Sequence, residues 1–239
     1  MNENLIIMEH MEQGSQEWLD ARIGVITASP MQRLLTGGSG ATRDAYILEV
    51  VSEILTGVPA EKIKTLDMIR GNLLEGHAID AYSAVTGHKV RRVGIMYLDA
   101  CKRIAASPDG LVMDGDRIVR GVEVKCPQPK AHMATIAAMN SPKKYEAQLQ
   151  SSMRVSGADH WDFVSFCPEF KHHPLVIISR ARDEDYIAKI VEATTLGIKQ
   201  IDEHVNAARA VQTHHAVEAI RLDALELIDI MSNREPEFN

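Results

Sequence analysis

The spacing of apolar residues predicts helices towards both ends of the chain and short strands in its central part. In the helical stretches apolar residues recur every three or four positions, the spacing of one buried helix face. Two of these stretches end at Gly57 and Gly87, and glycine commonly ends a helix. The predicted helices span residues 15–22, 27–35, 42–56, 66–86, 130–139, 142–155, 183–210 and 211–231.

From residue 89 onward the helical period gives way to short, partly β-branched segments separated by turns, which predict a mostly antiparallel meander. The predicted strands are 89–99, 103–107, 110–114, 117–125, 161–167 and 175–180. Together the elements predict one α/β domain, 1–239, with a central mixed sheet flanked by helices. Its core is expected at about 13–180, and a C-terminal helical layer at about 183–231.

One predicted strand carries charged side chains on one face and valines on the other. Successive side chains of a strand alternate between faces, so Glu123 and Lys125 point one way and Val122 and Val124 the opposite way. A charged pair flanked by apolar residues on a short strand is poorly explained by solvation alone. This strand is therefore where we expect chemistry.

A turn just upstream, Ser107-Pro108-Asp109-Gly110, supplies a second carboxylate. The turn alone is typical of a type I β-turn, and a Glu-x-Lys strand alone is typical of an exposed ion pair. In neighbouring strands, however, Asp109 and Glu123 can share a magnesium ion, with the lysine over the attacking water or the phosphate. The combination predicts a metal-dependent nuclease site.

Other residues are candidates for the same site, each with a plainer alternative. Glu75 offers a third carboxylate or is a surface residue, and Gln148 orients a phosphate or water or is a solvated helix residue. Arg22, with Thr27 and Ser29, offers a guanidinium and two hydroxyls for a phosphate, or is a surface arginine beside a helix cap.

Composition changes this picture little. The chain has 26 basic and 33 acidic residues, a net charge of −7, but three basic pairs lie in its central half near the candidate site. No apolar run reaches the ~20 residues of a membrane helix, and the N-terminus lacks a signal pattern, which predicts an intracellular protein. Three widely spaced cysteines indicate neither a disulfide framework nor a zinc site.

Five motifs, in order, resemble those of the phage lambda exonuclease family, the YqaJ-type viral recombinases. They lie between about residues 13 and 153, and the last third of the chain carries no matching motif. As an ordered set they are specific, although each alone is not. The motifs are Gln13-Gly14-Ser15-Gln16-Glu17-Trp18 leading to Arg22-Ile23-Gly24-Val25-Ile26-Thr27-Ala28-Ser29; Gly71 with Glu75; Ser107-Pro108-Asp109-Gly110; Glu123-Val124-Lys125-Cys126-Pro127; and Tyr145-Glu146-Ala147-Gln148-Leu149-Gln150.

The resemblance implies a restriction-endonuclease-like core and a magnesium-dependent 5′-3′ exonuclease on linear double-stranded DNA. Such enzymes release 5′-mononucleotides and leave 3′ single-stranded overhangs for recombination by strand annealing. Two Mg²⁺ ions per active site are implied, with Mn²⁺ as a substitute. A homotrimer around DNA, a single-strand annealing partner and a phage or prophage protein acting in the bacterial cytoplasm are implied as well.

The resemblance also assigns roles to residues. Asp109, Glu123 and the Val124 carbonyl would be metal ligands, and Lys125 would position or help deprotonate the water. Glu75 would be an outer acid that holds the lysine or a second ion.

By the same resemblance, Gln148 would align the nucleophile at the other end of the site. Arg22, Ser29 and Ser107 would bind the 5′ phosphate of a DNA end, and Met68 would be the wedge between the end bases.

Three alternatives stay open at this stage. A site-specific endonuclease on the same core shares the acidic turn and the Glu-x-Lys strand, whereas the Arg22 block and the Gln148 helix favour an exonuclease. A DNA-end-binding recombination scaffold without catalysis is disfavoured because all candidate ligands are present. An unrelated α/β binding protein would have to match five ordered motifs by chance.

Overall fold

The computed structural model describes residues 4–36, 40–60, 65–211 and 215–232. The chain divides into two compact units, Met1–Asp202 and Glu203–Asn239. The second unit contains the end of helix α7 (Glu184–Ala210) and helix α8 (His215–Ser232). Among the helices so described, none combines the length and apolarity that a membrane span requires. The expectation that 183–231 forms a layer on the core stays a prediction.

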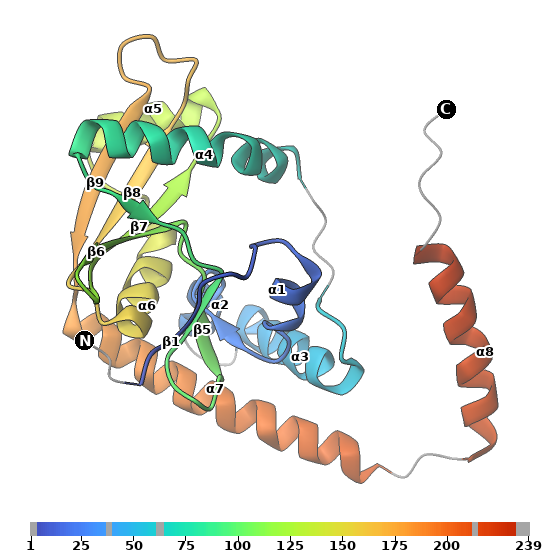
Figure 1. Cartoon of the computed structure of the whole chain (residues 1–239). Helices are drawn as coiled ribbons and strands as arrows, with labels where there is room; N and C mark the ends of the chain where they lie inside the picture. The colour runs from blue at the N-terminus through green and yellow to red at the C-terminus, as the bar shows by residue number, and fades with distance from the viewer. Residues whose placement is uncertain (1–3, 37–39, 61–64, 212–214, 233–239) are drawn as a thin grey trace, which may run out of the picture. The chain divides into compact units, whose positions relative to one another are not determined.

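Two sheets form the centre of the first unit (Figure 1). The four-stranded sheet has the order β1 (Ile6–Met8), β4 (Ile95–Tyr97), β5 (Ile104–Ala106) and β2 (Ile26–Thr27). The five-stranded sheet has the order β3 (Val90–Arg91), β6 (Gly110–Asp114), β7 (Arg117–Lys125), β8 (His160–Phe166) and β9 (Leu175–Ala181). Neighbours are antiparallel except β2 with β5 and β7 with β8, so the predicted mixed α/β class is confirmed.

The predicted strand 89–99 is wrong as a single element. It is divided into β3 and β4, which belong to different sheets. The chain bends between them at Gly94, where an added Cβ would lie 2.3 Å from the Met11 carbonyl oxygen. This close approach of two backbone segments admits only glycine.

The long helices match the sequence prediction, and the short ones differ at their starts. Helices α3 (Ala41–Thr56) and α4 (Leu66–Thr86) end at glycines with left-handed backbone angles, as expected. Helix α2 (Met31–Leu35) begins four residues late, because Thr27 pairs with Ala105 in the sheet. The remaining elements are α1 (Gln16–Asp20), α5 (Pro129–Ala138), the 3₁₀ turn Lys143–Tyr145 and α6 (Glu146–Ser156).

Different helices cover the two faces of the five-stranded sheet. Helix α4 packs on the valine face through Ala78, Ile79 and Tyr82, which contact Val122 and Val124 in one buried cluster. Helix α6 packs on the opposite face and also contacts the smaller sheet, so it lies between the two sheets. The face that carries Glu123 therefore lies under α6.

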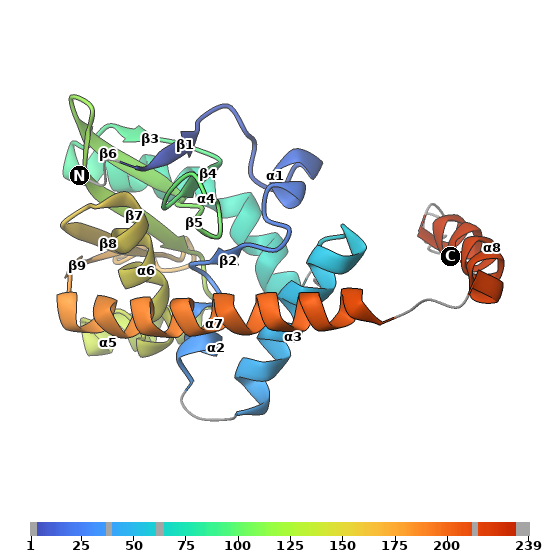
Figure 2. The ribbon, with the colours of Figure 1, turned by 90° about the horizontal axis from the view of Figure 1, so that it is seen from below.

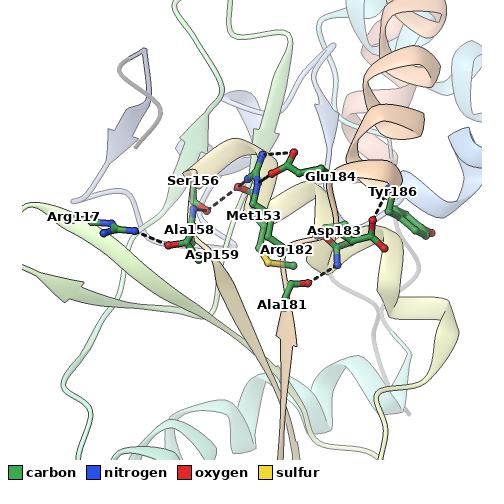
Figure 3. Close-up of polar contacts among 11 residues, drawn as sticks. Arg117, Met153, Ser156, Ala158, Asp159, Ala181, Arg182, Asp183, Glu184 and Tyr186 are labelled. Carbon is green, nitrogen blue, oxygen red and sulfur yellow. Dashed lines mark hydrogen bonds and ion pairs between the residues drawn. The ribbon is translucent and has the colours of Figure 1, made fainter.

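The first part of α7 packs against α6 and α2 (Figure 2). The Arg154 guanidinium of α6 donates to Thr194 Oγ1 at 2.9 Å, and Gly197 lies against Leu34 of α2. Figure 3 shows how α7 begins: Asp183 Oδ1 accepts from the Tyr186 N–H at 2.9 Å.

Arg182, the residue just before Asp183, forms further hydrogen bonds in the same region of the fold. Arg182 donates from its guanidinium to the Met153 carbonyl at 2.7 Å, and its backbone N–H donates to the Asp159 carbonyl at 2.9 Å (Figure 3). These bonds join the end of β9 to the end of α6 and to the turn before β8.

Candidate active site

The sheet register brings the two predicted carboxylates together. Gly110 of β6 pairs with Val122 of β7, so one step further along the ladder Asp109 lies opposite Glu123. Asp109 Oδ2 accepts a hydrogen bond of 2.6 Å from the Val124 N–H. The turn and the strand, separate motifs in the sequence, thus form one site at the end of these strands.

Glu123 is the centre of the hydrogen-bond network. The residue is 2% exposed, and its Oε1 accepts from both the Lys125 ammonium and the Gln148 amide, the latter at 2.6 Å. The Lys125 Nζ also lies 5.3 Å from the centre of the Tyr145 ring, which stacks on Phe163 in the same face of the sheet. The strand alternation therefore produced the expected common face for Glu123 and Lys125.

The carboxyl groups of Asp109 and Glu123 lie close to each other in a buried site. Burial, followed by the charge of Glu123, raises the pKa of Asp109 to about 7, while Lys125 and the Val124 N–H act to lower it. Burial lowers the pKa of Lys125, but Glu123 and Asp109 outweigh it, so the net pKa lies above the usual lysine value. Lys125 is therefore an ammonium at neutral pH, next to the carboxyl groups of Glu123 and Asp109.

The residues fit a hard divalent cation. Carboxylate oxygens are the ligands that Mg²⁺ prefers, and Mg²⁺ is often held by only one or two carboxylates with water completing the shell. Within the described part of the chain, no group of three or more His, Cys, Asp or Glu side chains is placed to hold a metal. Asp109 and Glu123, at opposed positions of neighbouring strands, would hold such an ion, with the Val124 backbone beside them.

A second cluster places a guanidinium among hydroxyls. Arg22 donates to Ser107 Oγ and to Thr27 Oγ1, both at 3.3 Å, and lies 4.1 Å above the ring of Trp18. Burial lowers the pKa of Arg22, and no ion pair joins it to a carboxylate within the described residues. A shielded cation surrounded by hydroxyl groups is suited to an anion.

Gln148 connects the two clusters. Its amide Nε2 donates to Glu123 Oε1 at 2.6 Å and to Ser29 Oγ at 3.3 Å. Ser29 thereby lies beside the carboxylates as well as near the segment that carries Arg22 and Thr27. Gln148 thus links the acidic cluster to Ser29, two residues from Thr27.

Two predicted residues lie outside this network. Glu75 of α4 forms an ion pair with Arg92 and none with Lys125. Met68 lies in the first turn of α4, where its N–H donates to Thr65 Oγ1 and its side chain is exposed. The outer-acid role of Glu75 and the wedge role of Met68 stay predictions.

Sequence reasoning missed the residues that hold the segments together. Trp18 Nε1 donates to Ser107 Oγ at 3.0 Å and to the Gly94 carbonyl at 3.1 Å. Gln13 Nε2 bridges the carbonyls of Val93 and Pro108 at 3.0 and 2.8 Å. Both residues stand in the first motif, but local spacing gave no sign of partners about 80 or more residues away.

The three cysteines provide a test of this environment. Burial raises the pKa of Cys126, next to Lys125, to about 11, and it also raises the pKa of Cys167, whereas Cys101 is exposed. Because the thiolate is the reactive form, N-ethylmaleimide at pH 8 is expected to label Cys101 alone in the native protein. Intact mass should show one adduct per chain, and three after denaturation. Rapid labelling of Cys126 would contradict the buried strand end.

Comparisons with known proteins agree with this architecture. Residues 17–159, more than half of the chain, match the YqaJ-like viral recombinase domain. The chain belongs to this family. The resemblance to the lambda exonuclease family is thereby confirmed. The curated proteins compared with the chain give no match.

Solved structures show the same fold. LHK-Exo, an alkaline exonuclease from Laribacter hongkongensis, is 30% identical with a TM-score of 0.74; the match covers 82% of this chain and 96% of that one. Its complex with dAMP gives a TM-score of 0.75 at the same identity and coverage. A phage-related exonuclease from Haemophilus somnus 129PT, 17% identical with a TM-score of 0.56, covers 77% of this chain and 96% of its own. The restriction-endonuclease-like fold is confirmed.

Proposed function

We propose that this protein is a Mg²⁺-dependent 5′-3′ exonuclease on linear double-stranded DNA, with Mn²⁺ able to substitute. The observation that carries the proposal is the pairing of Asp109 and Glu123 beside Lys125, with Gln148 linking Glu123 to Ser29, two residues from the Thr27 hydroxyl that Arg22 contacts. Membership of the family and the likeness to an alkaline exonuclease support a nuclease.

Each residue has a chemical task in this proposal. Asp109 and Glu123 would hold the ion, with the Val124 carbonyl as a further ligand. The bound ion would supply charge neutralisation and activation of water. Lys125, kept as an ammonium by its two carboxylate neighbours, donates to the attacking water or to the phosphate oxygens, where negative charge develops. Gln148 orients the water through its amide oxygen, since its amide nitrogen already donates to Glu123 and Ser29.

The adjoining anion pocket favours an exonuclease over a site-specific endonuclease. We assign the binding of the terminal 5′ phosphate to Arg22, Ser107 and Ser29. An exonuclease can recognise a DNA end through this phosphate only if the phosphate is bound next to the cleavage site. The dAMP complex of LHK-Exo is consistent with a site that accommodates a mononucleotide. A homotrimer, a strand-annealing partner and action in the bacterial cytoplasm remain parts of the proposal.

The test uses one DNA molecule in two forms. Linear duplex and covalently closed circle are incubated with the protein, with Mg²⁺ or with EDTA. We expect Mg²⁺-dependent release of mononucleotides from the linear form and an intact circle. Linearised circles would indicate an endonuclease, and end binding without any release would indicate a scaffold.

The Arg22→Ala variant separates recognition of the end from chemistry. A hydrogen bond to a charged group contributes about 1.5–3 kcal/mol. We therefore expect the preference for 5′-phosphorylated over 5′-hydroxyl ends to fall about tenfold or more. The measurement is kcat/KM on two duplexes that differ only at the 5′ end. Equal losses on both substrates would remove Arg22 from the phosphate pocket.

A further inference from the structure

Arg92 lies at the edge of the candidate active site, and none of the roles described so far involves it. It lies in the irregular segment between β3 and β4, and its guanidinium forms an ion pair with Glu75 of α4. The Arg92 side chain is 58% exposed, and that of Glu75 is 29% exposed. An exposed ion pair of this kind contributes only about 0–1 kcal/mol to stability.

One glutamine fixes the Arg92 segment to the turn that carries Asp109. The Gln13 amide donates to the carbonyl of Val93, the residue after Arg92, and to that of Pro108, the residue before Asp109. The Gly94 N–H also donates to the Met8 carbonyl at 3.0 Å. Arg92 is therefore attached to a rigid part of the backbone, although its side chain faces solvent.

The position and the N–H donors of Arg92 indicate that it can bind a phosphate. The Gln13 side chain holds the carbonyl next to Arg92 and the carbonyl next to Asp109 at the same time, which places the Arg92 segment beside the turn that carries one of the proposed metal ligands. A guanidinium has five N–H donors, and the pairing with Glu75 is made through Nη2 alone. The remaining N–H donors of the planar guanidinium can bind two oxygens of one phosphate at the same time, which fixes the orientation of that phosphate.

We propose that Arg92, held in place by Glu75, binds a phosphate of the DNA strand that enters the active site. This inference rests on the proposed nuclease function and adds a phosphate contact to it. Arg92 is a DNA-binding residue, and Glu75 is a positioning residue that restrains the guanidinium. Glu75 then serves an arginine, whereas the family resemblance assigned it to the lysine or to a second ion.

The neighbouring arginine provides a matched control. Arg91 has the same charge and is exposed to a similar degree, but it lies on β3 and pairs with Glu9. Arg92→Ala, Arg92→Lys and Arg91→Ala are compared with the wild type. Affinity for a 5′-phosphorylated duplex is measured by fluorescence anisotropy in EDTA over a range of salt concentrations, so that neither metal nor cleavage contributes.

A lost phosphate contact changes the salt dependence in a defined way. Each contact contributes about −0.9 to the slope of log K against log salt concentration. We expect the magnitude of the slope to fall by about one for Arg92→Ala, with about tenfold weaker binding at low salt, and to stay unchanged for Arg91→Ala and Arg92→Lys. An unchanged slope for Arg92→Ala, or an equal fall for Arg91→Ala, would overturn the proposal.

Glu75→Gln tests the positioning part separately. We expect it to weaken binding less than Arg92→Ala, and the double variant to bind like Arg92→Ala alone, because the restraint matters only while the arginine is present. Additive losses would contradict that role. Absence of nucleotide release from the wild type with Mg²⁺ would refute the nuclease function, and the binding slopes would still decide on Arg92.

Discussion

The Lys125→Ala variant is expected to release nucleotides at least about 100-fold more slowly than the wild type, since a positioned proton donor contributes about 10²- to 10⁴-fold. Lys125 is the ammonium that contacts Glu123, and the two acids beside it keep it charged. Affinity for a DNA end in EDTA should change by less than about threefold, because the Lys125 charge is already paired with Glu123 inside the site and adds little to phosphate binding before metal is present. Single-turnover cleavage and binding in EDTA give the two values.

Lys144→Ala is the control for this loss. Lys144 lies 4.9 Å from the centre of the same Tyr145 ring that Lys125 approaches, but it is exposed and has no ion pair with Glu123. We expect its single-turnover rate to stay near that of the wild type. Full activity of Lys125→Ala, or equal losses in both variants, would refute the assigned role of Lys125.

The Asp109→Asn variant is expected to lose nucleotide release and to gain stability at alkaline pH in the absence of metal. In the folded protein the pKa of Asp109 is about 7, above its ordinary value of 3.8, so the folded state binds this proton more tightly than the unfolded chain does. The contribution of Asp109 to stability therefore falls as pH rises from about 4 to about 7, and stays low above that. Asparagine has no charge to bury and removes this loss.

Thermal unfolding in EDTA at pH 5 and pH 8 measures the effect. The gain of Asp109→Asn over the wild type should be larger at pH 8 than at pH 5, by about 1–3 kcal/mol. Comparing the variant with the wild type at each pH cancels the titration of other groups. A variant that is no more stable than the wild type at pH 8 would show that the two carboxylates are not in conflict.

The sequence predicted those parts of the protein that depend on local rules. Strand alternation placed Glu123 and Lys125 on one face, and terminal glycines fixed the ends of α3 and α4. The approach of Asp109 to Glu123 was predictable because a short hairpin separates them, so that neighbouring strands bring them opposite each other.

Long-range contacts account for what the sequence did not predict. The contact between Arg22 and Ser107 depends on Trp18, whose indole donates a hydrogen bond to the same serine, 89 positions away in the sequence. Glu75 pairs with Arg92 because α4 and the segment before β4 meet in space, which no spacing rule encodes. The edge strand β1 is short and lacks a distinct alternation, so its pairing with β4 had no local signal.

The central claim is that the protein removes nucleotides from the 5′ end of a duplex. Its most direct test is a linear duplex with 5′-phosphates, in which one strand is labelled internally near its 5′ end or, in a second sample, near its 3′ end. With Mg²⁺ we predict early release of the 5′-proximal label as a mononucleotide and delayed release of the 3′-proximal label. Earlier release of the 3′-proximal label, or products longer than mononucleotides, would contradict this account.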